Sequence, residues 1–372
     1  MSKYLGSVQP ILGRRGFLRL TIGGTACSMM MPEILLNQEK RTSNTSLVED
    51  KIYLKHDTGE FAWENIRRLK ALHDGLKDAD LLRSLHPIAP QKAELEWVEL
   101  VHRKQYVETV KRDAEGGAKV LSTGHTLLSK DSYDVALWAA GGVLSACDAV
   151  MEGKTRNAFC AVRPPGHHAG RDKGMGFCIF NNAAVAARYV QKKYRLEKVL
   201  IVDWDVHHGN GTQDIFYEDG SVFYFSTHQW PWYPFTGSEE ETGEGEGRGT
   251  TLNAPLPAGS GDEELVSAFE TRLLPRALKF RPDFVLISAG FDSRNADPLG
   301  RFRLTDEGFK KLTRIMLHIA GESAEGRLVS ILEGGYSLKG LSMAVPAHVE
   351  VLIKGQLGSL PGENPFDFDI SR

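Results

Sequence analysis

The clearest pattern in the chain is a set of five short apolar runs, each bounded by polar or glycine-rich residues. They span residues 158–162, 199–202, 222–226, 284–288 and 328–332. Their side chains are almost continuously apolar instead of alternating with polar ones, which indicates strands buried on both faces. Such strands are typical of a parallel sheet that is covered by helices on both sides.

Amphipathic stretches with helical spacing lie between these runs, over residues 132–151, 182–193, 263–280 and 305–322. Strands that alternate with helices predict an α/β fold with a central, mostly parallel sheet. No internal repeat and no hydrophilic break interrupts the chain after residue 50, so a single domain is the simplest organisation. We place this domain at residues 51–356 and treat residues 357–372 as a C-terminal tail.

The N-terminal segment differs from the rest of the chain. Arg14-Arg15 is followed by a short, glycine-containing apolar stretch, which is typical of a twin-arginine export signal. We assign residues 1–35 to this signal and the polar residues 36–50 to a linker. This assignment predicts export to the periplasm of a bacterium, and without it the protein would be cytoplasmic.

Composition narrows the function classes. The net charge of −3 gives no basic field for nucleic acid, so we expect no direct binding to DNA or RNA. The four cysteines are widely spaced without a Cys-x-x-Cys pair, which argues against a disulfide framework and a thiolate zinc site. We expect no apolar run of the roughly 18 residues that a membrane-spanning helix needs. An oligomer is compatible with the sequence but not indicated by it.

Polar and titratable residues follow all five apolar runs. In chain order these groups span residues 163–168, 203–207, 226–228, 289–292 and 333–336. The carboxyl ends of parallel strands meet at one edge of a sheet, where open α/β proteins bind metals and substrates. The sequence therefore predicts an active site at this edge.

Asp205, His207 and Asp292 combine carboxylate oxygens with an imidazole nitrogen, which are ligands that suit zinc. Asp205 and His207 are two positions apart, so in extended backbone their side chains point to the same side. Three protein ligands with one open position is the arrangement of catalytic zinc sites. Gly209 and Gly211 predict an end to regular structure after these ligands.

His167 and His168 follow Pro165-Gly166, a turn that can present both rings. Adjacent side chains are expected to diverge, so this pair suits proton transfer better than joint ligation of a metal. Each ring then needs a carboxylate or amide behind its other nitrogen. Tyr336, after two glycines, carries a phenol that can donate to a developing oxyanion. A surface histidine pair and a core tyrosine are the plainer alternatives.

Several longer motifs stand in order along the chain. They are Pro-Pro-Gly-His-His-Ala at 164–169, Gly-Met-Gly-Phe-Cys-Ile-Phe-Asn-Asn at 174–182, Asp-Trp-Asp-Val-His-His-Gly-Asn-Gly-Thr at 203–212, Ser-Ala-Gly-Phe-Asp at 288–292 and Glu-Gly-Gly-Tyr at 333–336. Together they resemble the zinc-dependent histone deacetylase family, in its class II and bacterial deacetylase-like amidohydrolase branch. The resemblance covers about residues 50–355 and implies a single domain of the arginase/deacetylase type.

The resemblance implies roles for the residues at the strand ends. Asp205, His207 and Asp292 would bind zinc, and His167 and His168 would act as general base and acid. Tyr336 would polarise the amide carbonyl opposite the metal. The implied reaction is hydrolysis of the acetyl-lysine amide, in protein or peptide, to lysine and acetate. Behind the two histidines the resemblance puts Asp203 at His167 and Asn210 at His168.

An acyl-lysine tunnel is also implied, with Phe177, preceded by Gly176, on one wall and Tyr233 on the other. At the mouth, Leu299 occupies the position where polyamine deacetylases of the family carry Glu. Leucine cannot attract a second ammonium group, so the sequence favours acetyl-lysine over acetylpolyamine. Acetylpolyamine or another small amide remains the alternative substrate.

Two departures from the family pattern lie at the mouth of the tunnel. His125 stands where relatives commonly carry the Asp that grips the substrate backbone, which predicts weaker backbone recognition or a substrate that is not a peptide. Phe235 replaces a glycine, which predicts either packing within its loop or a narrowed, extended rim.

The resemblance also implies structural potassium at two sites. The residues that match the first are Asp203, Asp205, His207, Ser226 and Thr227, and those that match the second are Phe216, Asp219 and Val222.

Two other classes of protein compete with this reading. Arginase-like ureohydrolases of the same architecture need an Asp-x-His-x-Asp run for a second metal ion, but Gly209 stands at the last position here. A non-catalytic reader of acyl-lysine would be expected to lose Tyr336 or one of the paired histidines, and all three are present. The sequence therefore favours a catalytic site with one metal ion.

Overall fold

The computed structural model describes residues 45–355, and the signal segment, most of the linker and the tail lie outside that range. A parallel sheet of eight strands forms its centre, in the order β2-β1-β3-β8-β7-β4-β5-β6. This confirms the predicted α/β fold. The strands are β1 (Thr45–Val48), β2 (Leu85–Ile88), β3 (Asn157–Cys160), β4 (Val199–Asp203), β5 (Val222–Gln229), β6 (Thr251–Leu256), β7 (Phe284–Ala289) and β8 (Leu328–Leu332).

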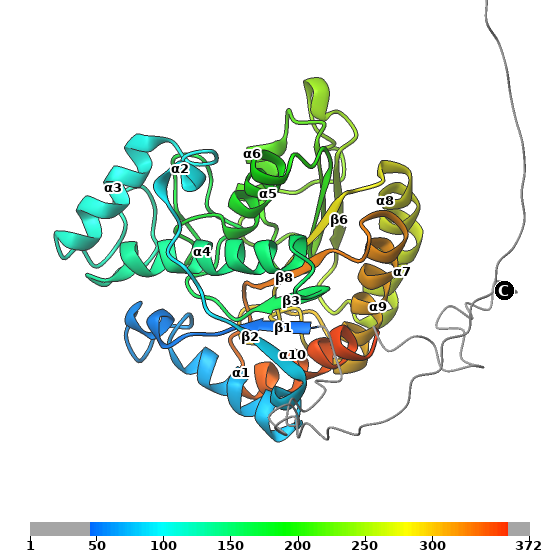
Figure 1. Ribbon diagram of the computed structural model, residues 1–372, viewed down its shortest axis with the longest axis horizontal. Helices are drawn as coiled ribbons and strands as arrows, with labels where there is room; N and C mark the ends of the chain where they lie inside the picture. Colours follow the sequence, from blue (N-terminus) through cyan, green and yellow to red (C-terminus); the bar gives the residue numbers. More distant parts are fainter. Residues whose placement is uncertain (1–44, 356–372) are drawn as a thin grey trace, which may run out of the picture. The chain divides into compact units, whose positions relative to one another are not determined.

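Helices cover both faces of the sheet. Figure 1 shows α4 across one side, and α1 and α10 across the other, where they pack against each other. The α-helices are α1 (Arg67–Asp78), α2 (Leu95–Val98), α3 (Lys104–Glu115), α4 (Ser132–Met151), α5 (Asn182–Tyr194), α6 (Asn210–Phe216), α7 (Asp262–Ser267), α8 (Leu274–Phe280), α9 (Asp306–Ser323) and α10 (Leu338–Lys354). Short 3₁₀ turns occupy Lys51–Lys55, Leu82–Ser84 and Gly245–Gly247.

The five predicted strands are the five neighbours β3, β8, β7, β4 and β5 in the middle of the sheet. Every residue of these strands is buried, which explains their continuous apolar pattern. Their carboxyl ends lie side by side, because all neighbouring pairs run parallel. The polar groups that follow them are thereby brought to one edge.

The linker assignment was wrong for residues 45–48, which form β1 between β2 and β3. All four residues are buried although two of them, Thr45 and Ser46, are polar. The hydroxyl of Thr45 donates to the carbonyl of Leu352, 3.0 Å away, so its burial leaves no unmet hydrogen bond.

Helix α4 is the one helix in the described residues that is long and apolar enough to cross a membrane, a property we expected no segment to have. Within its most apolar window, 72% of the residues are buried in the protein. It packs against α5, β3 and β8, and this burial accounts for its apolar sequence. It is a core helix of the domain.

The stretch predicted as one helix over residues 263–280 is divided into three parts. A π-helical segment, Ala268–Leu273, separates α7 from α8. The apolar pattern continues through all three, because Leu265, Phe269, Leu273 and Ala277 are buried on the same side of the domain core. The pattern therefore predicted the burial correctly but not the change of helix type.

Candidate active site

Three side chains from neighbouring strand ends converge at the carboxyl edge of the sheet. Asp205 and His207 follow β4, and Asp292 follows the adjacent strand β7. The Nδ1 atom of His207 lies 2.9 Å from Asp205 Oδ1 and 3.2 Å from Asp292 Oδ2. One ligand atom from each residue lies within 4.8 Å of the other two, so all three could bind one metal ion.

Positive charge is favoured at this cluster, because its two carboxylates are buried. Burial, and then the carboxylate of Asp205, raise the pKa of Asp292 to about 7. Burial disfavours the charged form of His207, but its hydrogen bonds to the two carboxylates outweigh this effect and raise its pKa to about 10. Two buried carboxylates around one imidazole form a site that a divalent cation would stabilise.

Backbone groups hold the two carboxylates in place. The N–H of Gly334 donates to Asp205 Oδ2 at 2.9 Å, and the N–H of Val206 donates to Asp292 Oδ1 at 2.9 Å. A Cβ atom at Gly334 would clash with both carboxylates. Glycine at this position therefore leaves room for the cluster.

Asp205 and His207 meet by a different route from the one expected. Strand β4 ends at Asp203, so both residues lie in the following loop and not in extended backbone. The N–H of His207 donates to Asp205 Oδ1 at 2.9 Å, which folds the loop back on itself. The prediction that regular structure ends at the glycines was also wrong. Gly209 directly precedes helix α6, and a Cβ atom at Gly209 would clash with the carboxylate of Asp203.

His167 has a carboxylate behind it, as predicted. Its Nδ1 lies 3.0 Å from Asp203 Oδ2, which also accepts the hydroxyl of Tyr224 at 3.2 Å. Burial disfavours the imidazolium form of His167. The carboxylates of Asp203 and Asp205 outweigh this effect and raise the pKa of His167 to about 10. The two carboxylates therefore favour the protonated form of His167.

His168 is the neutral member of the pair. Its Nδ1 lies 2.8 Å from Asn210 Oδ1. An amide oxygen can only accept, so Nδ1 carries the hydrogen and Nε2 keeps a free lone pair. Burial, and then the nearby rings of His167 and His207, lower the pKa of His168 well below its usual value.

The two rings of this pair lie closer together than expected. The centroids of His167 and His168 are 4.0 Å apart, although adjacent side chains were expected to diverge. Divergence is a property of extended backbone, and the chain turns here after β3 instead of extending.

A cavity of about 320 Å³ opens onto the cluster. His168, His207 and Tyr336 line it, and the aromatic rings of Phe177 and Tyr233 form its walls. The Phe177 ring stands edge-on to Tyr336 at 5.6 Å, and the Tyr233 ring stands edge-on to His168 at 5.3 Å. All four residues predicted to contact substrate, Gly176, Phe177, Tyr233 and Leu299, are among its lining residues.

The two departures at the rim have different surroundings. His125 lines the cavity, together with Trp232 and Pro298, which were not predicted. Phe235 is 69% exposed, so it does not pack within its loop. Its backbone φ of +65° places it at the tip of a turn, where its N–H donates to the Trp232 carbonyl at 2.7 Å.

Two buried carboxylates support residues that are predicted to be catalytic, and their own positions were not predicted. Asp297 Oδ2 accepts the N–H groups of Tyr336 at 2.7 Å and Ser337 at 2.9 Å. Glu333 Oε2 accepts the N–H groups of Gly166 at 2.7 Å and His167 at 3.2 Å. Glu333 belongs to one of the sequence motifs and Asp297 to none, and only the fold brings them to these N–H groups.

Comparison with known proteins agrees with this geometry. Residues 62–352 match the histone deacetylase domain. The chain belongs to the histone deacetylase family. A probable deacetylase of Archaeoglobus fulgidus is 40% identical over 298 residues, which are 80% of this chain and 82% of that protein. The resemblance seen in the sequence is thereby confirmed.

Other relatives are longer than the region that they share with this chain. Histone deacetylase 10, chloroplastic, of Oryza sativa is 43% identical over 68% of this chain and 60% of its own length. The polyamine deacetylase HDAC10 of Mus musculus is 39% identical over 80% of this chain and 46% of its own length. The crystal structure of the HDA15 HD domain superposes with a TM-score of 0.80 at 38% identity, covering 85% of this chain and 91% of that one.

Family membership makes the chain a hydrolase that acts on amide bonds. Both substrate classes considered from the sequence are compatible with these relatives. The structure shows where each of these residues lies, and its role in catalysis stays a prediction.

A second group of potential ligands consists of Cys178, Glu333 and His167 of the histidine pair. Its members are already engaged. Glu333 accepts two N–H groups and, through Oε1, the hydroxyl of Ser288 at 3.0 Å. Burial raises the pKa of the Cys178 thiol well above its usual value, which keeps it protonated. These contacts indicate a structural role for Cys178 and Glu333.

The residues matched to potassium lie in two places. Ser226 and Thr227 lie within β5, and Ser226 pairs with Asp203 of β4. The buried hydroxyl of Thr227 has no hydrogen-bond partner among the described residues. Phe216 and Val222 are buried near Asp219.

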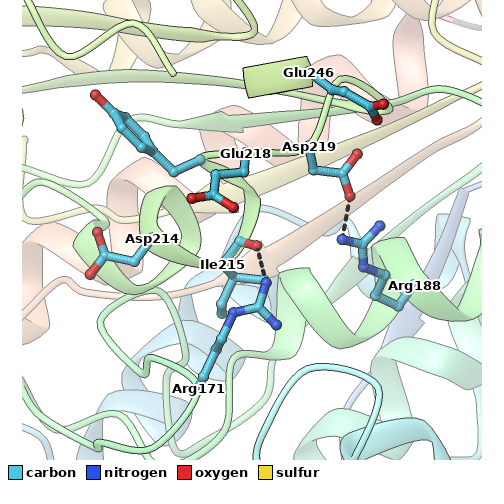
Figure 2. Close-up of a pocket in the computed structure, with 8 residues that line it drawn as sticks. Arg171, Arg188, Asp214, Ile215, Glu218, Asp219 and Glu246 are labelled. Carbon is cyan, nitrogen blue, oxygen red and sulfur yellow. Dashed lines mark hydrogen bonds and ion pairs between the residues drawn. The ribbon is translucent and has the colours of Figure 1, made fainter. Parts of the chain in front are cut away.

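Asp219 lines a separate cavity of about 630 Å³, shown in Figure 2, that contains none of the predicted catalytic residues. Two of its charged side chains have printed contacts in Figure 2: Arg188 pairs with Asp219, and Arg171 donates to the carbonyl of Ile215 at 2.6 Å. Its lining residues include no histidine, and neither potential metal-ligand group of the described residues lies among them.

Proposed function

We propose that the protein is a zinc-dependent deacetylase that hydrolyses the amide of an acetylated lysine side chain to lysine and acetate. The observation that carries this proposal is the position of the cluster of Asp205, His207 and Asp292. It lies at the inner end of an aromatic-walled cavity, beside a histidine with a free lone pair.

The donor set fits zinc. One imidazole nitrogen and two carboxylate oxygens are common zinc ligands, and three protein ligands are the number that catalytic zinc sites use. The raised pKa values of Asp292 and His207 also indicate that positive charge is favoured at this cluster. When bound, zinc would act as a Lewis acid and lower the pKa of the attacking water.

Proton transfer is assigned to His168. Its lone pair on Nε2 can accept the proton that the attacking water loses, and it can later return that proton to the leaving lysine amine. His167 is paired with Asp203, which favours its imidazolium form, and that form would stabilise negative charge that develops nearby. The sequence predicted a general base and a general acid on two histidines. Our proposal differs in that His168 alone transfers the proton in both steps.

Tyr336 is assigned to the oxyanion. Its hydroxyl makes no hydrogen bond with another residue in the described part of the chain and lines the cavity. Burial, and then the carboxylate of Asp292, raise its pKa well above the usual value, so it remains a donor at any working pH. Such a donor stabilises the tetrahedral transition state.

Acetyl-lysine in a peptide or protein is the favoured substrate. The cavity residues include no aspartate or glutamate, and Leu299 occupies the wall where a carboxylate would attract a second ammonium group. Acetylpolyamine remains the alternative, and one relative is named a polyamine deacetylase.

The test is a zinc-loaded assay on acetyl-lysine peptides, longer acyl-lysines and acetylpolyamines, with a hydroxamate inhibitor as control. We expect acetate release from the peptides, and its loss in Asp292→Ala. Turnover of no substrate, with Asp292→Ala identical to the wild type, would show that the protein is not a metal-dependent amidohydrolase.

We further propose that potassium binds at the two matched sites, and the unpartnered hydroxyl of Thr227 offers an oxygen ligand at the first of them. Replacing potassium by tetramethylammonium should then lower the melting temperature of the wild type. Equal melting temperatures in both salts would contradict it.

Export by the twin-arginine route is a separate proposal, based on Arg14-Arg15 outside the described residues. It predicts that the protein is found in the periplasmic fraction of a bacterial host. Replacement of both arginines by lysine should retain it in the cytoplasm, and an unchanged distribution would contradict export by this route.

A further inference from the structure

The mouth of the cavity is held together by His125. Its Nε2 accepts the backbone N–H of Gly176 at 3.4 Å and lies 3.2 Å from the hydroxyl of Tyr233. Gly176 and Tyr233 belong to the two loops that carry the aromatic walls. His125 therefore bridges both walls at the rim.

This bridge determines which hydrogen-bonding groups His125 can offer to a substrate. A backbone N–H can only donate, so Nε2 must be the unprotonated nitrogen and the hydrogen must sit on Nδ1. The hydroxyl of Tyr233, 3.2 Å away, can donate to this Nε2 only by sharing its single lone pair with the Gly176 N–H. The remaining polar atom of the ring, Nδ1, makes no hydrogen bond with any residue in the range 45–355. It is a donor on an exposed residue.

The charges near the mouth, like this donor, do not favour a positively charged substrate group. None of the residues that line the cavity is an aspartate, glutamate or lysine. The guanidinium of Arg301 lies 5.3 Å from the ring centroid of Trp232, one of the residues that line the cavity. A substrate with an ammonium group near the mouth would meet a hydrogen-bond donor and a positive charge, and neither attracts it.

We propose that His125 is a specificity-determining residue that donates a hydrogen bond from Nδ1 to a carbonyl or carboxylate oxygen of the substrate, next to the acylated side chain. The substrate class is therefore acylated lysine within a peptide or with a free carboxylate, and not acylated polyamine, which offers only donors. This inference rests on the proposed amide hydrolysis and identifies the part of the substrate that lies outside the tunnel.

Three amides that share the same group inside the tunnel test the proposal. The first is Nα-acetyl-Nε-acetyl-lysine methylamide, which has two carbonyls outside. The second is N-pentylacetamide, which has neither acceptor nor charge outside. The third is N-acetylcadaverine, which ends in an ammonium group. The ratio of kcat/KM between the first and second amide measures recognition of the acceptor alone.

Two nearly isosteric variants separate the donor from the bridge. In His125→Gln the amide oxygen can still accept from Gly176 while the NH2 group donates outward. In His125→Glu both oxygens only accept. We expect His125→Gln to keep the wild-type preference for the first amide within about threefold, and His125→Glu to reduce that preference about three- to tenfold. The Glu variant should also gain activity on N-acetylcadaverine.

A reduction of equal size on all three amides in His125→Glu would overturn the proposal, because His125 would then act only by holding the walls together. An unchanged preference in this variant would overturn it as well. Dissociation constants of the three amides, measured by calorimetry for the wild type and His125→Glu, give the same comparison without hydrolysis. Absence of hydrolysis in the wild type would count against the proposed reaction, while the binding ratio still decides the role of His125.

Discussion

Replacement of Tyr336 by phenylalanine isolates the contribution of one hydroxyl group to the reaction. The ring contacts would remain, since Phe177 packs edge-on at 5.6 Å and the Arg68 guanidinium lies 5.0 Å from the ring centroid. No residue of the described chain would lose a hydrogen-bond partner. We therefore expect the free energy of unfolding to change by less than about 1 kcal/mol.

The catalytic effect of the same change should be much larger. Loss of one oxyanion donor raises the barrier by about 2.7–4 kcal/mol, which corresponds to a decrease of about 10²–10³-fold in kcat. KM should change little, because the hydroxyl acts on the transition state more than on the bound substrate. Steady-state kinetics on an acetyl-lysine peptide, with matched zinc content, measures both parameters.

Tyr233→Phe is the matched control. It also removes a phenol from the cavity wall, but that hydroxyl bonds to His125 at the rim. We expect kcat to fall less than about tenfold, the size of one ordinary hydrogen bond. If Tyr336→Phe keeps kcat within threefold of the wild type, or if both variants lose the same amount, Tyr336 does not stabilise the oxyanion.

Three further predictions follow from the buried polar groups. Asn210→Asp places a carboxylate behind His168, so the pKa of His168 should rise and the acid limb of the kcat/KM profile should move to higher pH; an unmoved profile would show that Asn210 does not tune His168. His348 is buried, and burial lowers its pKa from 6.5 to about 3, so the unfolded chain binds its proton first as the pH falls. The free energy of unfolding should therefore decrease below about pH 6.5, and His348→Gln should reduce that slope by up to about 1.4 kcal/mol per pH unit, measured by urea unfolding between pH 6 and 4; an equal slope in both proteins would contradict a neutral buried histidine. Asp297→Asn turns one acceptor into a donor opposite the backbone N–H groups of Tyr336, Ser337 and Leu299 and should cost about 1–3 kcal/mol of stability in the same assay, whereas a variant as stable as the wild type would show that these bonds are replaceable.

The centre of the sheet could be predicted from the sequence, but its margins could not. The five predicted strands are buried on both faces, so burial alone produces a continuous apolar run. The margins carry β2 and β6, which contain Pro87 and Pro255, and a proline is tolerated at the edge of a sheet. Near the first margin, β1 contains Thr45 and Ser46, whose hydroxyls obscured the pattern. Edge strands in this protein lack the signal by which strands are recognised.

The metal cluster and the histidine pair were predictable because each follows a strongly apolar strand. The partners of these residues were less visible. Asp297 and Glu333 act through backbone N–H groups that only tertiary folding brings near them. The tautomer of His125 likewise depends on Gly176, 51 residues away in the sequence. Hydrogen bonds between distant segments leave no periodic trace in the chain.

Zinc content measured together with acetate release tests the central claim most directly. The wild type and Asp292→Asn would be stripped with a chelator, titrated with zinc and assayed for bound metal by atomic absorption and for acetate from an acetyl-lysine peptide. Asparagine keeps the size of the side chain but removes the negative charge next to His207. We predict one zinc per wild-type chain, with activity rising in proportion, and loss of both in Asp292→Asn. Acetate release by zinc-free wild type, or full zinc binding and activity in Asp292→Asn, would contradict a catalytic zinc at this cluster.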